Sequence, residues 1–236
     1  MSLNNNSIGK LSIGPSLVTD GLILYLDAAS KRSYDGGVTW KDLSGNDNDF
    51  TVYGSPNHNG QYFTLDGSTS QYVQANPFPH PAEDFTIELY ERIDIFDNTP
   101  LYSYAVIGDS NEGLLYLIPF GRGVIKVYGP SSSESTGYEL TTDAFHQIVR
   151  TRSKSDGEEK IYINGTLVST ITKDVGVSTI TNGSFNVGQE QDSPGGGFHS
   201  DQTLNGDISI IKVYDRVLSA QEVHTNYKDI KVRYND

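Results

Sequence analysis

The sequence predicts an all-β fold, an antiparallel two-sheet β-sandwich of the jelly-roll type with one short C-terminal helix. Apolar and polar residues alternate with a period of two almost throughout, which is typical of half-buried strands. Glycine, asparagine and aspartate residues recur between these runs and favour turns. A chain of 236 residues with 15 tyrosines and 24 glycines is long enough for one large β domain. Regularly spaced strands and turns of this kind indicate a sandwich.

The amino-terminal half contains four predicted strands. Residues 21–27 form an apolar run, and residues 61–65 and 71–74 flank a turn. Residues 85–95 alternate over a longer strand, of which one face is expected to be core and the other partly exposed. The core face carries Phe85, Ile87, Leu89, Ile93 and Ile95, interrupted by Glu91, and the other face carries Thr86, Glu88, Tyr90, Arg92 and Asp94.

The carboxy-terminal half adds two hairpins, two further strands and the helix. The Asn164-Gly165 pair predicts a type I′ turn, because these residues tolerate positive φ best. The capping box formed by Ser219 and Glu222 predicts a helix that begins there and ends at about Tyr227. The predicted hairpins join residues 114–119 with 123–128 and 160–163 with 166–170, and the two strands cover residues 184–187 and 207–214.

Composition excludes several functions. A formal net charge of −13 opposes binding to a phosphate backbone, so nucleic acid is not an expected partner. The chain has no cysteine and therefore no disulfide. Residues 1–16 lack the basic start and apolar run of a secretory signal, and no stretch approaches ~18 apolar residues, so neither export nor membrane insertion is expected. This polar segment is expected to be a flexible or docking arm before a single domain, residues 17–236.

The most informative stretch is the acidic loop GQEQDSPGGGF, which places two carboxylates two residues apart and three glycines after them. In an extended segment Glu190 and Asp192 project to the same side, and the glutamine between them leaves its carbonyl oxygen free. The glycines permit the chain to double back and bring Gln202 or Asp201 near them. Neighbouring anions repel unless a cation lies between them, and calcium accepts mixed oxygen ligands at ~2.3 to 2.6 Å. The loop therefore predicts half of a calcium site; the alternative is a solvated surface loop whose acidic residues serve solubility.

The acidic loop and the strand and helix after it resemble the calcium loop and following segment of the pentraxins, the calcium-dependent pattern-recognition lectins. The resemblance covers about a sixth of the chain closely. It implies four calcium ligands: Glu190 and Asp192 through their side chains, Gln191 through its carbonyl and Gln202 through its amide. His199 stands where the family has an acidic ligand of a second calcium, so one well-held ion is expected rather than two.

A second segment resembles the part of the pentraxins that supplies an adjacent Asp-Asn pair. Asn111 matches the asparagine, whereas Ser110 occupies the place of the aspartate and Asp109 lies one residue earlier. Asp109 and Asn111 are therefore further candidate metal ligands, with an ordinary turn between two strands as the alternative. Tyr116 matches a hydrophobic wall beside the ion, although an alternating core position is an equal alternative. Tyr116 and His199 are the candidates for contact with a bound ligand.

The amino-terminal third, LVTDGLILYLDAASKRSY onward, resembles the concanavalin A-like lectin/glucanase superfamily in the laminin G-like form of phage virion proteins. The resemblance implies the same sandwich, and it implies a virion location for a protein made in the cytoplasm, with other virion proteins as partners. The alternative location is a cell surface.

One segment of this third invites a second metal hypothesis. Residues 42–49 alternate Asp, Ser and Asn, but an EF-hand needs glycine at the sixth position and Glu where Tyr53 stands. A tight turn is the favoured interpretation, because Asp and Asn side chains satisfy their own turn backbone. Trp40 is expected in the core rather than as a platform for a sugar.

The sequence favours a binding protein over an enzyme. Retaining glycosidases of this fold have a Glu-x-Asp-x-x-Glu pattern on one strand. In this chain Gly195 stands where the last Glu of that pattern would be. Glu88 and Glu91 fall on opposite strand faces and cannot flank one bond. We expect a calcium-dependent module that binds a glycan or a phosphorylated small ligand, assembled as a homo-oligomer. The alternative is a structural virion decoration or tail-fibre protein whose calcium only clamps loops; a glycoside hydrolase is less favoured.

Overall fold

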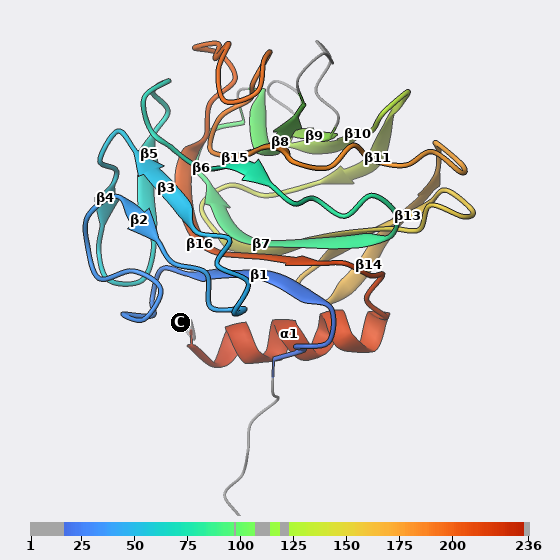
Figure 1. Ribbon diagram of the computed structural model, residues 1–236, viewed down its shortest axis with the longest axis horizontal. Coiled ribbons are helices and arrows are strands. Elements are labelled where there is room, and N and C mark those ends of the chain that lie inside the picture. The colour runs from blue at the N-terminus through green and yellow to red at the C-terminus, as the bar shows by residue number, and fades with distance from the viewer. Residues whose placement is uncertain (1–16, 97, 107–113, 119–122, 234–236) are drawn as a thin grey trace, which may run out of the picture.

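The computed structural model is a sandwich of two antiparallel β-sheets with one helix outside it (Figure 1). It describes residues 17–96, 98–106, 114–118 and 123–233. Sheet A contains β1 (Leu22–Asp27), β4 (Asn57–His58), β5 (Phe63–Asp66), β7 (Phe85–Ile93), β12 (Phe145–Arg152), β13 (Glu158–Ile163), β14 (Thr166–Thr172) and β16 (Asn205–Tyr214). Sheet B contains β2 (Thr39–Trp40), β3 (Phe50–Tyr53), β6 (Tyr72–Phe78), β8 (Thr99–Ala105), β9 (Leu114–Ile118), β10 (Val124–Tyr128), β11 (Ser133–Glu139) and β15 (Gly183–Val187), and the helix is α1 (Ala220–Arg233).

The strand order brings together segments that are distant in the chain. Sheet A runs β14-β13-β12-β7-β16-β5-β4, with β1 also paired to β16, and sheet B runs β11-β10-β9-β8-β15-β6-β3-β2. The central strand β7 therefore lies between β12 and β16, and β15 lies between β8 and β6. The predicted fold class, an all-β antiparallel sandwich with one carboxy-terminal helix, is confirmed.

The hydrophobic core lies between the facing sides of the two sheets, as period-two patterning requires. Phe85, Ile87 and Leu89 on β7 are at most 1% exposed and belong to it. Trp40 is fully buried against Phe63 with ring centroids 4.9 Å apart, which confirms its core position. Each large apolar side chain buried in this way contributes about 1.5 to 3 kcal/mol.

The predicted faces of residues 85–95 are right for the core and wrong in two other respects. Strand β7 ends at Ile93, so Ile95 lies beyond it and is 52% exposed instead of joining the core. Most of the opposite face is not exposed to solvent, because α1 covers it: Thr86 and Glu88 are fully buried. Figure 1 shows α1 lying along the outer side of sheet A.

The helix begins where the capping box predicts but is longer than expected. The Ser219 backbone N–H donates to the Glu222 carboxylate at 2.8 Å, and the Glu222 N–H donates to Ser219 Oγ at 3.3 Å. Hydrogen bonds from Arg216, together with those from Ser219, lower the pKa of Glu222 to about 2. The helix continues past Tyr227 because Ile230 is fully buried in a small cluster with residues of β7 and β16.

Two predicted turns are confirmed, whereas several strands escaped prediction. Asn164 and Gly165 both have positive φ, 51° and 75°, between β13 and β14. In the 42–49 segment the Asp42 carboxylate accepts hydrogen bonds from three backbone N–H groups, as expected of a tight turn rather than an EF-hand. Of the strands that the structure describes, six were not predicted: β2, β3, β4, β8, β11 and β12. Strand β12 buries Arg150 and Arg152 in the core, which breaks its apolar pattern. Within the described ranges, no helix has the length and apolar character needed to cross a membrane.

Candidate calcium-binding loop

The acidic loop, residues 188–204 as the structure folds it, connects β15 of sheet B to β16 of sheet A and doubles back on itself. The Glu190 N–H donates to the Gln202 carbonyl at 3.3 Å, and the Leu204 N–H donates to the Gly188 carbonyl at 3.0 Å. Gly188 has a φ of +95°, and a Cβ there would lie 2.5 Å from Leu65. The two ends of the loop therefore lie side by side, and Gln202 is beside Glu190.

The tip of the loop turns at the glycines. Ser193 and Gly196 exchange backbone hydrogen bonds of 3.2 and 2.9 Å, and Gly195 and Gly197 both have a φ of +74°. Only glycine adopts this region without strain, so the run of three glycines permits the fold-back predicted for it. In Figure 1 the loop, in orange, projects from sheet B on the side opposite α1.

Gln191 anchors the loop through its side chain. Its amide nitrogen lies 3.2 Å from Ser103 O and 2.9 Å from Ser184 O, and its amide oxygen accepts from the Gly195 N–H at 2.7 Å. Because the side chain is used in this way, its backbone carbonyl is the oxygen that could face a cation. Among the described residues that carbonyl accepts no hydrogen bond. The side chain of Gln191 thus holds the loop, and its carbonyl is left for the ligand role that the resemblance implies.

The loop packs on polar residues of the outer face of sheet B, which sequence reasoning missed. Ser103, Ser184 and Asn186 are fully buried, although they alternate with the core residues of β8 and β15. Ser103 Oγ donates to the Gln189 carbonyl at 2.9 Å, and Gln74 donates to Asn186 at 2.8 Å. The signal was present in the sequence as alternating polar residues, but these predict an exposed face unless the covering segment is known.

The donor set fits a calcium ion. Glu190 is fully buried at the base of the loop, whereas the side chain of Asp192 is 48% exposed at its rim. Gln202 is half-buried, and its backbone groups are engaged by Glu190 and His199, which leaves its side-chain amide for another role. A cation held by these oxygens would offset the cost of burying the Glu190 carboxylate.

His199 contacts the same carboxylate that the prediction assigns to the metal. Its Nε2 lies 2.9 Å from Asp192 Oδ2, and its side chain is 61% exposed. This contact was not foreseen from the sequence, where His199 figured as the substitute for an acidic residue. A histidine at this distance shares Asp192 with any bound cation and, when protonated, competes with it.

The remaining predicted residues are placed only in part. Asp109 and Asn111 lie outside the described residues, and Tyr116 is placed by its backbone in β9, opposite Tyr102 of β8. Strand β8 pairs with β15, the strand that precedes the acidic loop. Within the part of the chain that the structure describes, no three His, Cys, Asp or Glu side chains gather closely enough to hold a metal. Of the six predicted metal ligands, the described loop contains four, Glu190, Gln191, Asp192 and Gln202, and the calcium site stays a prediction.

The fold and the loop define a lectin-like β-sandwich with an oxygen-rich acidic loop. The family model described as "Pentaxin family" matches residues 61–235, and the chain belongs to this family, the pentraxins. It is 33% identical to C-reactive protein of Rattus norvegicus over 179 residues, which cover 75% of this chain and 76% of the relative. Membership of this family supports calcium as the cofactor and a calcium-dependent, lectin-like ligand-binding module.

Two solved structures show the breadth of the fold. A heptameric SAP-like pentraxin from Limulus polyphemus superposes with a TM-score of 0.56 at 20% identity, covering 75% of this chain and 81% of its own. Trypanosoma rangeli sialidase in complex with sialic acid superposes with a TM-score of 0.67 at 16% identity, covering 92% of this chain but 34% of its own. At these identities the likeness concerns the fold alone.

Proposed function

We propose that the acidic loop binds one calcium ion and that this ion, with the loop around it, recognises a glycan or a phosphorylated small ligand. The observation that carries the proposal is the folded-back loop itself, in which a buried Glu190, an exposed Asp192 and a half-buried Gln202 share one hairpin. Bound calcium would supply coordination positions that hydroxyl or phosphate oxygens can fill.

Each residue of the loop has a distinct part in this proposal. Glu190 holds the ion from the buried side, and Asp192 holds it from the solvent side, where a ligand can approach. Gln191 positions both carboxylates by tying the loop to β8 and β15. The arrangement serves binding rather than catalysis, since a carboxylate that ligates a cation is not free to donate a proton.

Further parts of the proposal extend beyond the described loop. Asp109 and Asn111 complete the set of metal ligands, and Tyr116 forms a wall for the ligand. A homo-oligomer is the proposed assembly, in keeping with the pentraxin of Limulus polyphemus, whose structure is heptameric. The virion location, with its virion partners, rests on the amino-terminal resemblance alone and stays a prediction, as does a cell surface.

Affinity chromatography tests the proposal. The protein is applied to phosphocholine resin and to a glycan array with calcium and again with a chelator, and we expect retention that the chelator reverses. Asp192→Asn should abolish retention, because it removes a ligand charge that faces solvent. Glu134→Gln, which alters an exposed acidic residue on β11 outside the loop, is the control and should be retained.

A structural clamp is the competing function, and the same experiment separates the two. If calcium raises the unfolding temperature but the protein binds neither the resin nor any glycan, the loop only stabilises the fold and the recognition proposal fails. A protein with no calcium-dependent part of its retention, on the phosphocholine resin or on any glycan, would contradict it as well.

A further inference from the structure

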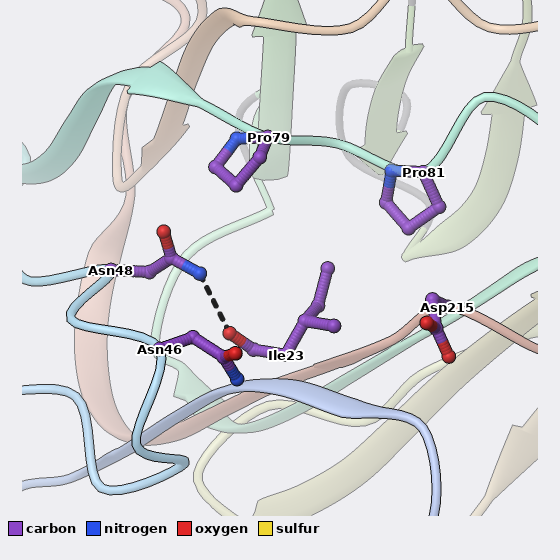
Figure 2. A pocket seen from close by; sticks show the side chains of 6 residues that line it. All are labelled: Ile23, Asn46, Asn48, Pro79, Pro81 and Asp215. Carbon is purple, nitrogen blue, oxygen red and sulfur yellow. Dashed lines mark hydrogen bonds between the residues drawn. The ribbon is translucent and has the colours of Figure 1, made fainter.

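A pocket lies between β1, the 42–49 turn and the segment that connects β6 to β7. It shares no residue with the acidic loop. It is about 350 Å³ in volume and is lined by Ile23, Asn46, Asn48, Pro79, Pro81 and Asp215 (Figure 2). Pockets that bind small molecules are typically ~300 to 1,000 Å³, so this one has room for a compact ligand.

The two asparagines stand on a turn that is already rigid without a ligand. Asp42 Oδ1 accepts from the Tyr25 N–H at 2.8 Å, which ties the turn to β1, and Asp42 Oδ2 accepts from the Asn48 N–H at 3.1 Å. The Asp42 N–H donates to Asp49 at 2.8 Å and closes the turn. The side chains on this turn are therefore held in place before anything binds, which lowers the entropic cost of binding.

Both asparagines line the pocket, and each keeps an amide oxygen as a hydrogen-bond acceptor. The amide nitrogen of Asn48 donates to the Ile23 carbonyl at 2.8 Å, and that of Asn46 lies 3.3 Å from the Leu22 carbonyl and 2.9 Å from Ser44 Oγ. The two bonds of Asn46 use both of its N–H donors and the bond of Asn48 uses one of its two, whereas neither amide oxygen accepts a hydrogen bond from any described residue. Figure 2 shows the Asn48 oxygen on the side of the amide away from Ile23.

A carboxylate lines the pocket across Ile23 from the asparagines. Asp215 follows β16, and its N–H donates to the Gly21 carbonyl at 2.9 Å. Gly21 has a φ of +73°, and a Cβ there would lie 2.7 Å from Asp215 Oδ1, so the glycine makes room for the carboxylate. Asp215 is exposed, and it forms no ion pair with any residue in the described ranges. Acceptor oxygens thus predominate in the polar lining, beside one amide N–H of Asn48.

The remaining wall is apolar and firmly fixed. Pro79 and Pro81 flank His80, which is 1% exposed and packs edge-on against Phe85 with ring centroids 4.8 Å apart. The His80 N–H donates to the Phe78 carbonyl at 2.9 Å, and its Nδ1 lies 2.9 Å from the Pro81 carbonyl. The buried histidine therefore holds the two proline rings as one side of the pocket, with Ile23 beside them (Figure 2).

We propose that this pocket binds a neutral saccharide without calcium. A sugar ring offers hydroxyl donors around its edge and apolar C–H groups on its faces, and the pocket offers acceptors at its two ends and proline and isoleucine surfaces between them. A cation is the competing ligand, but one carboxylate is the only formal charge in the lining, and the two asparagine oxygens are neutral.

The pocket lies at the border of the region that the family model matches. Ile23, Asn46 and Asn48 precede the region 61–235 that the family model matches, whereas Pro79, Pro81 and Asp215 lie inside it. The amino-terminal segment thus creates a pocket at the border of the family region. The proposal does not depend on the acidic loop, so a chelator separates the two sites.

The test is a titration of the ¹⁵N-labelled protein in the presence of EDTA, followed by amide chemical shifts. The probes are glucose, galactose, mannose, N-acetylglucosamine, lactose and maltose, with tetramethylammonium chloride as the cationic probe. We expect at least one sugar to shift the amides of Asn46, Asn48 and Asp215 and to leave those of the acidic loop unchanged.

Two variants and one control give the expected pattern. Asn48→Leu and Asp215→Ala should each weaken binding of that sugar by about tenfold, which is the effect of losing ~1.4 kcal/mol. Asp215 is exposed, so Asp215→Ala remains informative if Asn48→Leu fails to fold. Glu134→Ala, which removes an exposed carboxylate on β11, should bind as the wild type does. The proposal is overturned if none of the sugars shifts these amides, if only tetramethylammonium does, or if Asp215→Ala binds sugar unchanged.

Discussion

The two outer faces of the sandwich both bury polar residues, but they do so under different covers. On sheet A the cover is α1, and the buried carboxylate of Glu88 accepts hydrogen bonds from Lys212 at 3.1 Å, Gln147 at 2.9 Å and Asn226 at 2.7 Å. On sheet B the cover is the acidic loop, and its buried carboxylate belongs to the loop itself, at Glu190. On the helix-covered face, Lys212 of β16 supplies the counter-charge.

From this difference we infer that the outer face of sheet A is built for stability and the outer face of sheet B for binding. A carboxylate neutralised by a lysine needs nothing from solution, and its site is closed. A carboxylate on a glycine-rich loop, beside the exposed Asp192 and the half-buried Gln202, can take its counter-charge from a dissolved cation and release it. We therefore regard the α1 face as structural and the loop face as functional.

The largest expected effect comes from breaking the pair under α1. Lys212→Met leaves the buried Glu88 without its lysine and should lower the free energy of unfolding by about 3 to 5 kcal/mol, with or without calcium. Urea denaturation measures it. The control is Lys41→Met. It removes an exposed ion pair in which Lys41 lies 3.9 Å from Asp35, and it should cost less than about 1 kcal/mol. A loss for Lys212→Met as small as that of the control would refute the comparison.

A third buried glutamate sharpens the comparison, because it has neither kind of compensation. Glu91 faces the core from β7, and no hydrogen bond from the described chain reaches either of its oxygens. Burial raises the pKa of its carboxyl well above the usual 4.5. The folded protein then holds a proton that the unfolded chain releases, so this group makes stability fall as pH rises from about 4.5 toward the folded-state pKa.

Glu91→Leu should remove that fall. The free energy of unfolding of the wild type should decrease by up to about 1.4 kcal/mol for each pH unit in this window because of Glu91, and the variant should lack that part of the slope. Urea denaturation at several pH values from acid to neutral measures both proteins. Parallel slopes for wild type and Glu91→Leu would show that Glu91 is not protonated in the folded state.

The anchor of the acidic loop should have a smaller effect on stability and a clear effect on binding. Gln191→Ala removes the hydrogen bonds to Ser103, Ser184 and Gly195, and it should cost about 1 to 2 kcal/mol. Calcium affinity should fall too, although no carboxylate is lost. Hydrogen exchange at the Gly195 amide reports on the loop directly; exchange as slow as in the wild type would mean that the side chain does not hold the loop.

The smallest expected effect concerns His199. His199→Ala frees Asp192 from a partner at 2.9 Å, and calcium affinity should rise by about two- to threefold, because the two side chains are 61% and 48% exposed and such contacts are weak. Calorimetry measures the affinity, and His224→Ala in α1 serves as the control. Weaker calcium binding by His199→Ala would show that the histidine supports the site instead of competing for it.

Much of this architecture could be predicted from local patterns. The alternation along residues 85–93 placed Glu91 on the core face, the capping box located the start of α1, and the glycine run explained the fold-back of the acidic loop. In each case the physical cause acts between residues close in the chain: the period of the strand, a side chain over three residues, and backbone angles open to glycine.

The contacts that escaped prediction join residues far apart in the chain. Glu88 is buried because Asn226 lies over it, 138 residues later, and Ser103 is buried because Gln191 lies over it, 88 residues later. Alternation shows that a face is polar but not that another segment covers it. The prediction that Ile95 joins the core was wrong for a related reason: the apolar alternation continues to Ile95, whereas the strand ends at Ile93.

Calorimetric titration of calcium into the wild type and into Glu190→Gln tests the account most directly. We predict that the wild type binds calcium and that Glu190→Gln, which keeps the shape of the buried side chain but removes its charge, binds at least about tenfold more weakly. Equal calcium affinity in the two proteins, or no heat of binding in the wild type, would contradict it.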